Sequence, residues 1–337
     1  MAQPRRVTLR DISADTGLSV AAVSYALRGL HVPEETQIRV RESAERLGYK
    51  VNPIARALAS GRSDQVGVMC RSLADLWQQG TSARLGRALL ATGRQALIVD
   101  SCDDPDLEER LARRLLDQRV DALLTFPVNP AAEHWAQAAQ ETVLVSIGDA
   151  LPGAATYAEI VFDNQRAVRS ALDGLVGLGH SRIAVLTHID NSTPDRPIEL
   201  VVQQMAEDSH ADIRLHTCMS DLEGSATVVT RLLQGADPPT AFCCLADSMA
   251  YGVYSAARAL GLSIPEDISV VGNDDNPIST LLTPPLWSYE WPVSEVVSAI
   301  VDATTEGVVD EIRRGRTVIS AREHRRASAA APPGADS

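Results

Sequence analysis

The sequence is poor in aromatic residues, and it has no apolar run long enough to cross a membrane. Aromatic residues make up 4% of the 337 positions and hydrophobic residues 45%, so we expect a large and mainly aliphatic core. A membrane-spanning helix needs ~20 consecutive apolar residues. The N-terminus is polar and leads directly into a helical pattern, without the apolar stretch of a signal peptide. We therefore expect a cytoplasmic protein without a membrane partner.

Cysteine is also scarce, and its positions fit neither a set of disulfide bridges nor a metal site. The number of cysteines is odd, and their spacing does not match that of zinc ligands. We expect buried, reduced thiols, no metal and no other cofactor. The five positions are Cys70, Cys102, Cys218, Cys243 and Cys244.

Positive charge is scarce in most of the chain but not near its N-terminus. Residues 1–63 carry ten Lys and Arg against six Asp and Glu, a net charge of +4. The remaining residues carry 21 basic against 38 acidic side chains, a net charge of −17. This distribution suits a protein of which only the N-terminal part contacts a polyanion such as nucleic acid. A chance fluctuation in charge is the alternative.

Three helices are predicted before residue 48. The first follows Thr8 as N-cap and stops at Gly17, and the second follows Ser19 as N-cap. The third runs over residues 34–47. Two short helices joined by a tight turn and braced by a third are typical of a helix-turn-helix unit, although any small three-helix bundle shares the pattern. The inward positions of the third helix are predicted to be Ile38, Val40 and Ala44.

From residue 66 onward, short apolar runs alternate with amphipathic helical segments. This order predicts an α/β fold with parallel sheets that helices cover on both faces. Ligand-binding loops are expected at the carboxyl ends of the strands, facing a cleft between two lobes. The predicted strands are 66–70, 96–99, 122–126, 143–147, 159–162, 183–186, 213–217, 241–245 and 268–272.

The chain is expected to fold as an all-α headpiece and a two-lobed core. A break near residues 152–157 divides the predicted strands between the lobes, and the Ala, Pro, Gly and Ser content of the C-terminus predicts disorder. The predicted units are a headpiece at 1–50, a hinge helix and linker at 51–63, a core at 64–327 and a disordered tail at 328–337. Within the core, one lobe comprises 64–155 and 285–292, and the other comprises 156–284 and 293–327.

Motifs in order along nearly the whole chain resemble the lactose/galactose-repressor (LacI/GalR) family. They are residues 7–29, Pro33–Thr36, Leu47–Tyr49, Asn52–Leu58, Val161–Asn164, Leu178–His180, Pro265–Gly272, Asp274–Asp275, Pro284–Leu286 and Arg326–Ser328. The resemblance implies a homodimeric transcription regulator, most often a repressor, with a periplasmic-binding-protein-like core. Its implied partners are a palindromic operator in double-stranded DNA, to which it binds at the nucleoid, and a small-molecule effector such as a sugar derivative.

The resemblance also implies which residues contact DNA. The second helix enters the major groove, and paired hinge helices insert an apolar side chain, here Leu58, into the minor groove. Other readings remain open: Tyr25 packs against the third helix, His31 is only solvated, or Leu58 is a core residue. The implied DNA contacts are Thr8, Ser19, Val20, Ala21, Ser24, Tyr25, Arg28, His31, Asn52, Arg56 and Leu58.

The effector cleft departs from the family pattern more than the headpiece does. Asp75, Leu76 and Trp77 stand where relatives carry Asn-Pro-Phe, and Asn273 replaces the usual aromatic residue before Asp274. We therefore expect a small polar effector that is not a standard hexose. Asp247 and Asp274 could instead cap helices, Trp291 could only wall the strands that cross between the lobes, and Arg196 could form a surface ion pair. The implied effector contacts are Trp77, Phe126, Arg196, Asp247, Asp274 and Trp291.

Two other classes of protein share parts of this pattern. The sequence has no Walker loop, no glycine-rich dinucleotide turn, no nucleophile elbow and no His/Cys metal cluster, so we do not expect an enzyme. A secreted solute-binding protein has the same core fold, because fold alone does not fix function. Such a protein carries a signal peptide where this chain carries a basic headpiece.

Overall fold

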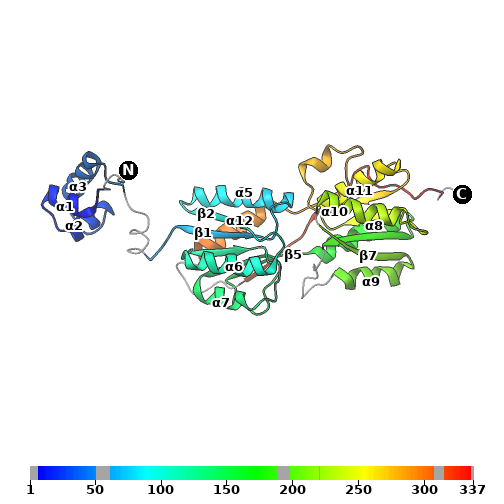
Figure 1. The fold of residues 1–337 in the computed structure, drawn as a ribbon, viewed down its shortest axis with the longest axis horizontal. Coiled ribbons are helices and arrows are strands. Elements are labelled where there is room, and N and C mark those ends of the chain that lie inside the picture. Colours follow the sequence, from blue (N-terminus) through cyan, green and yellow to red (C-terminus); the bar gives the residue numbers. More distant parts are fainter. Residues whose placement is uncertain (1–6, 51–60, 189–197, 220, 307–314, 335–337) are drawn as a thin grey trace. The chain divides into compact units, whose positions relative to one another are not determined.

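The computed structural model describes residues 7–50, 61–188, 198–219, 221–306 and 315–334. The chain divides into two compact units, Met1–Ser63 and Asp64–Ser337. The first carries the predicted headpiece and hinge, and the second carries the predicted core (Figure 1). No helix in these ranges is both long and apolar enough to span a membrane.

The headpiece contains the three predicted helices, α1 (Leu9–Thr16), α2 (Val20–Leu27) and α3 (Glu34–Leu47). One buried side chain of α1 packs against two from each of the other helices. These are Ile12, Val23, Ala26, Val40 and Ala44. Ile38 was predicted to face inward and is 49% exposed, so that prediction is wrong. Its neighbours Gln37 and Val40 instead occupy the side of α3 that meets the rest of the headpiece.

Local polar contacts fix the ends and the packing of the headpiece helices. The Thr8 backbone N–H and hydroxyl both donate to Asp11 Oδ2 at 2.8 Å, which starts α1. Asp15 links α1 to α3, because it accepts hydrogen bonds from the Ser43 hydroxyl and from the Arg46 guanidinium. The bond from Arg46 is the main cause that lowers the pKa of Asp15 to about 2.

The first lobe of the core is a six-stranded parallel sheet in the order β11-β5-β4-β3-β1-β2. Helices α5 and α12 pack together on one face, and α6 and α7 pack together on the other (Figure 1). The strands are β1 (Gln65–Cys70), β2 (Gln95–Asp100), β3 (Ala122–Thr125), β4 (Val143–Gly148), β5 (Ala158–Phe162) and β11 (Gly315–Ile319). The helices are α5 (Leu76–Ala91), α6 (Pro105–Asp117), α7 (His134–Glu141) and α12 (Val293–Glu306).

The second lobe is a four-stranded parallel sheet in the order β7-β6-β8-β9. Its helices also pack in pairs, and α10 lies so close to α11 that a Cβ at Gly252 would stand 2.0 Å from Ser225 Oγ. The strands are β6 (Arg182–His188), β7 (Asp212–Cys218), β8 (Ala241–Cys244) and β9 (Ser269–Val271). The helices are α8 (Asn164–Gly177), α9 (Ile198–Ser209), α10 (Leu222–Leu233) and α11 (Asp247–Leu260).

All nine predicted strands are present, but the predicted division between the lobes is wrong in three places. Strand β5 pairs with β4 in the first sheet, so the break at residues 152–157 is a loop within the first lobe. Helix α12 and strand β11 also belong to that lobe. Residues 285–292 were expected in the first lobe, but Trp287 bridges Val271 of β9 in the second sheet. This segment includes β10 (Ser288–Glu290), which pairs with β12 (Arg322–His324) and follows the 3₁₀ helix Pro277–Thr280.

Two smaller predictions also fail. The tail was expected to be disordered from residue 328, yet Ser328 is fully buried. Its hydroxyl donates to the Val270 carbonyl at 2.6 Å and accepts from the Trp287 N–H at 2.8 Å. These bonds attach this segment to β9 and to the residue that precedes β10. Four of the cysteines are buried and free as expected, whereas Cys102 is exposed in the loop after β2.

Candidate functional site

The predicted DNA-contacting side chains within the described headpiece lie on its surface. Ser19 caps α2, where its Oγ accepts a hydrogen bond from the Ala22 N–H at 3.2 Å. Val20 and Tyr25 are each 41% exposed although both are large and apolar. Ser24 is half-buried, and the exposed members are Thr8, Ser19, Val20, Ala21, Tyr25, Arg28 and His31. Asn52, Arg56 and Leu58 lie outside the described residues.

Tyr25, Arg28 and His31 form one polar and aromatic cluster at the end of α2. The rings of Tyr25 and His31 meet edge to face, with centroids 5.9 Å apart. The Arg28 guanidinium lies 5.3 Å from the centre of the Tyr25 ring, and its Nε donates to the Ser24 carbonyl at 3.2 Å. Tyr25 is thus 41% exposed and contacts side chains that follow it in the chain. The cluster presents a cation and two rings at the surface, which suits contacts with phosphates and base edges.

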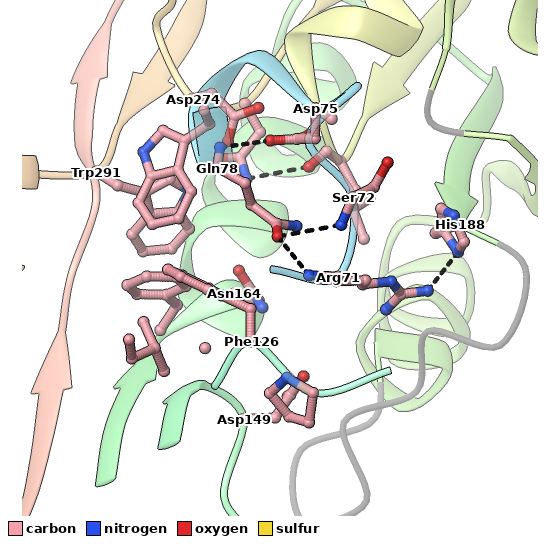
Figure 2. A pocket seen from close by; sticks show the side chains of 18 of the residues that line it. Arg71, Ser72, Asp75, Gln78, Phe126, Asp149, Asn164, His188, Asp274 and Trp291 are labelled. Atoms are coloured by element: carbon pink, nitrogen blue, oxygen red, sulfur yellow. Dashed lines mark hydrogen bonds between the residues drawn. The ribbon is translucent and has the colours of Figure 1, made fainter. Parts of the chain in front are cut away.

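A cavity of about 160 Å³ opens between the two lobes of the core (Figure 2). Its walls come from the loops at the carboxyl ends of strands from both sheets, where parallel α/β folds place their ligands. The first lobe contributes Arg71, Ser72, Asp75, Trp77, Gln78, Asp103, Phe126, Pro127, Ile147, Gly148, Asp149 and Phe162. The remaining lining residues are Asn164, His188, Leu245, Ala246, Met249, Asn273, Asp274 and Trp291.

One wall of the cavity is aromatic. The Trp77 ring meets Phe162 edge to face at 5.1 Å and Phe126 at 6.1 Å. Phe162 in turn stacks on Trp291, with centroids 4.9 Å apart and planes 28° apart. The structure thus brings Trp77, Phe126 and Trp291 together, as the sequence predicts, and adds Phe162 from the end of β5. Such a wall can accept the apolar face of a sugar or the carbon skeleton of another small molecule.

A charged cluster joins the lobes at the edge of the cavity. Arg71 follows β1, and its Nε lies 2.5 Å from Asp103 Oδ1. The same guanidinium lies 2.6 Å from Nδ1 of His188, which ends β6 in the second lobe. Burial alone would raise the pKa of Asp103, but the contacts with His188 and Arg71 outweigh it and lower that pKa. Because the cluster includes both lobes, it holds them in the arrangement that the structure shows.

Asp274 lines the cavity in a strained backbone conformation. Its φ is 115°, in the region that favours glycine, and its N–H donates to the Tyr289 carbonyl at 2.7 Å. Its Oδ2 accepts only a long hydrogen bond, 3.4 Å, from the Asp247 N–H. Burial, followed by the charges of Asp75 and Asp247, raises the pKa of Asp274. Asp274 thus lines the cavity, and its Oδ2 also contacts the first N–H of α11; a contact between Asp274 and an effector stays a prediction.

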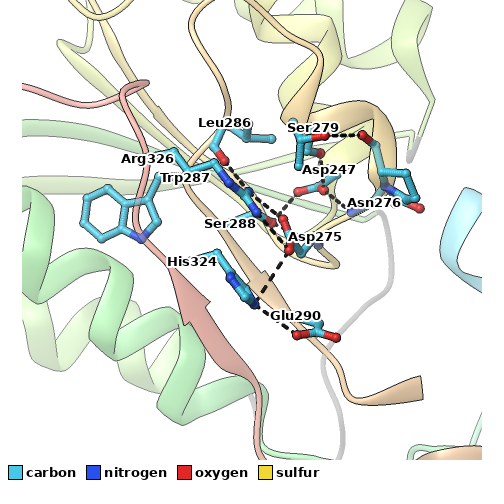
Figure 3. A network of polar contacts seen from close by, with 12 residues as sticks. Asp247, Asp275, Asn276, Ser279, Leu286, Trp287, Ser288, Glu290, His324 and Arg326 are labelled. Carbon is cyan, nitrogen blue, oxygen red and sulfur yellow. Dashed lines mark hydrogen bonds and ion pairs between the residues drawn. The ribbon is translucent and has the colours of Figure 1, made fainter. Parts of the chain in front are cut away.

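Asp247 was also predicted to contact the effector, and its geometry argues against this. It is fully buried and does not line the cavity. Its Oδ2 accepts from the Ser279 hydroxyl at 2.5 Å and from the Asn276 N–H at 2.8 Å, and its Oδ1 accepts from the Ser288 hydroxyl at 2.6 Å (Figure 3). Burial raises its pKa to about 6. Asp247 therefore fastens the loop between β9 and β10 to α11. Arg196 lies outside the described residues.

A second carboxylate, Asp275, holds β10 and β12 beside this loop. Arg326 donates to both of its oxygens, at 2.5 and 3.0 Å, and also to the Leu286 carbonyl at 2.7 Å (Figure 3). The His324 ring lies 3.0 Å from Glu290 and 3.7 Å from Asp275. These contacts hold β10 and β12 against the segment that carries Asp274.

A buried carboxylate also supports the first-lobe wall of the cavity. Glu108 on α6 is fully buried and accepts hydrogen bonds from the backbone N–H groups of Val128 and Asn129. That loop follows Phe126 and Pro127, which line the cavity. Burial raises the pKa of Glu108 to about 7, against an ordinary value of 4.5.

We expect Glu108→Gln to remove a pH dependence of stability. The pKa of Glu108 is higher in the folded state than in the unfolded state, so ionisation of this carboxyl disfavours folding. The free energy of unfolding of the wild type therefore falls as the pH rises towards 7. Between pH 5 and 8, the wild type should lose about 2–3 kcal/mol relative to the variant. Urea unfolding of both proteins at the two pH values measures this difference. Glu109→Gln, the exposed neighbour, is the control and should follow the wild type; equal pH profiles for all three proteins would contradict the assignment.

The sequence did not identify several cavity residues, although one signal could have found them. Arg71, Asp149 and His188 each end or immediately follow a parallel strand. Polar residues at the carboxyl ends of such strands are the usual ligand-contacting positions. Their pairing was not predictable, because Arg71 and His188 are 117 residues apart in the chain.

The fold and these sites together define a class of protein, namely a transcription regulator with a helix-turn-helix headpiece and a two-lobed core. Residues 172–329 match a model of the periplasmic binding protein-like domain. Catabolite control protein A of Priestia megaterium is 28% identical over 307 residues, which cover 86% of this chain and 89% of that protein. The regulator GalS of Salmonella typhimurium is 26% identical and covers 89% of this chain and 90% of its own length.

A crystal structure of the lac repressor dimer bound to operator and the anti-inducer ONPF has the same fold. Its TM-score is 0.83 at 22% sequence identity, and the match covers 97% of this chain and all of that one. Over nearly its whole length the chain is similar to DNA-binding transcription regulators of the lactose/galactose-repressor family. Its relatives are regulators, so the chain is classed with them and not with enzymes.

Proposed function

We propose that this regulator acts in the cytoplasm as a homodimeric repressor whose operator affinity is set by a small polar effector. The observation that carries the proposal is the combination of α2, the predicted DNA-recognition helix with its exposed side chains, and a cavity that both lobes of the core line. The lac repressor structure that shares the fold is a dimer bound to operator and an anti-inducer. By analogy, two headpieces would read a two-fold symmetric operator while the cavity holds the effector.

The cavity suits control by a ligand because its walls come from both lobes. A ligand changes the DNA-binding state only through its different affinities for two arrangements of the protein, typically about 1–3 kcal/mol. Asp274 comes from the second lobe and Trp77 from the first, so a ligand held by both stabilises one arrangement of the lobes. The Arg71–Asp103–His188 cluster, which also spans the lobes, would favour the same arrangement.

Selection of bound fragments from a pool of random DNA duplexes tests this proposal. The full chain should enrich a short inverted repeat, because a two-fold dimer with one recognition helix per subunit requires two symmetric half-sites. A flexible pyrimidine–purine step is expected at the centre, where Leu58 of the predicted hinge helices would insert. Enrichment of asymmetric, non-repeated sites would contradict the proposed dimer.

A further inference from the structure

Two carboxylates face the cavity from opposite lobes, and among the described residues neither forms an ion pair. Asp75 precedes α5 in the first lobe, and Asp274 follows β9 in the second (Figure 2). Within the described ranges, the ion pairs of this region involve other acids: Asp103 pairs with Arg71, and Asp275 pairs with Arg326. The chain therefore neutralises the acids on either side and leaves these two facing each other.

The protein maintains this arrangement against an electrostatic cost. Asp75 accepts hydrogen bonds from the backbone N–H groups of Gln78, at 2.8 Å, and Trp77, and the hydrogen bond that Asp274 accepts from the Asp247 N–H is long, at 3.4 Å. Burial raises the pKa of both carboxyls, and a nearby acid adds to the effect at each, although the charge of Arg71 partly offsets the rise at Asp75. Asp274 also keeps a φ of 115° that glycine would adopt without strain. Strain and charge repulsion retained at one point of a cavity are typical of a ligand site.

The aromatic wall provides a second, independent feature that points to a ligand. Trp77 is 8% exposed, lines the cavity and packs against Phe126 and Phe162. Its indole Nε1 has no hydrogen-bond acceptor among the described residues. Aromatic faces also attract organic cations.

We propose that the effector carries a protonated amine, which binds between Asp75 and Asp274 while its carbon skeleton lies against the aromatic wall. The inference rests on the proposed function, since it names the chemistry of the effector in the same cavity. A neutral sugar would leave both carboxylates unneutralised, and an anion would be repelled by them. Amino sugars and amino alcohols carry such an amine on a small polar carbon skeleton that suits a cavity of about 160 Å³.

The position of the amine also explains how the effector would act. An ammonium group held by one carboxylate from each lobe removes the repulsion between the lobes and adds two charge-assisted hydrogen bonds. Those contacts exist only when both carboxylates are close, so the ligand prefers the arrangement in which the lobes are together. The operator affinity would change with that preference.

Matched pairs of amine and neutral probes test the proposal on the full chain. The pairs are glucosamine with glucose, galactosamine with galactose, and ethanolamine with ethylene glycol. At saturating millimolar concentration, at least one amine should raise the melting temperature by about 3 °C or more while its neutral partner does not. Asp75→Asn and Asp274→Asn should each weaken binding of that amine about 10- to 100-fold. Glu266→Gln, an exposed acid of the second lobe, is the control and should keep the wild-type response.

The outcomes separate this inference from the proposed function. Binding by neutral members alone, binding by none, or an amine response that survives both substitutions would overturn the amine site. A neutral ligand that changes operator affinity would leave the proposed function standing and remove only the inference. An amine that binds through Asp75 and Asp274 but leaves operator affinity unchanged would support the site and remove its regulatory role.

Discussion

Asp247→Ala should destabilise the core by about 3–5 kcal/mol, more than any exposed substitution in the same lobe. The carboxylate is fully buried and accepts three hydrogen bonds, two from the loop between β9 and β10 and one from Ser288 at the start of β10. Its loss leaves the Ser279 and Ser288 hydroxyls and the Asn276 N–H buried without their acceptor, which costs about 1–3 kcal/mol for each group that finds no substitute. Gly272 packs against the same carboxylate, because a Cβ there would lie 2.2 Å from Asp247 Oδ1.

Tryptophan fluorescence during urea unfolding measures this loss in the core alone. The four tryptophans, Trp77, Trp135, Trp287 and Trp291, all lie in the core and none in the headpiece. Asp247→Asn retains one acceptor and should lose less stability than the alanine variant, whereas Glu266→Ala should match the wild type. An Asp247→Ala protein as stable as Glu266→Ala would show that the network in Figure 3 does not hold the loop.

Removal of residues 1–63 should abolish operator binding while the core remains folded. The deleted part carries the net charge of +4 and the recognition helix, and the remainder carries −17. Affinity for the selected repeat should fall by at least about 1000-fold, the usual ratio of specific to non-specific binding. Non-specific binding should fall as well, because an acidic core repels the phosphate backbone.

The deletion and a point variant together identify the part of the chain that reads DNA. The fluorescence-detected unfolding midpoint of residues 64–337 should match that of the full chain, since the core is a compact unit with its own buried residues. A full-length protein with Tyr25→Ala and Arg28→Ala should keep both units folded and lose specific affinity. If the isolated core bound the operator with the affinity of the full chain, the headpiece would not be the unit that recognises the DNA sequence.

The sequence predicts the interior strands well because their apolar runs are continuous. Strands such as β3, with four consecutive buried residues, carry this signal plainly. Strands β10, β11 and β12 do not carry this signal. Strand β11 has four exposed residues out of five, and β10 and β12 are three residues long. Their positions depend on pairing partners far away in the chain. For the same reason, the sequence wrongly predicts the boundary between the lobes at residues 152–157, because the pairing of β5 with β4 is not visible in it.

The sequence predicts those cavity residues that motifs mark along the chain. It does not predict which of them are held away from the cavity by residues distant in the chain. Trp77, Phe126 and Trp291 follow from the resemblance, and the structure places them at one cavity. Asp247 and Asp274 are both acids in the expected motifs, yet only Asp274 lines the cavity. The difference arises from the Ser279 and Ser288 hydroxyls, which fold back onto Asp247 from 32 and 41 residues away. No local pattern contains that information.

The ratio of two DNA affinities tests the central claim, which is that the basic headpiece recognises a specific DNA sequence. Fluorescence anisotropy at physiological salt should give a dissociation constant for the selected inverted repeat that is about 10³- to 10⁷-fold lower than for a shuffled duplex of the same composition. Both affinities should weaken as salt increases, because phosphate contacts release counterions. Equal affinity for the repeat and the shuffled duplex would contradict the assignment of this chain as a sequence-specific regulator.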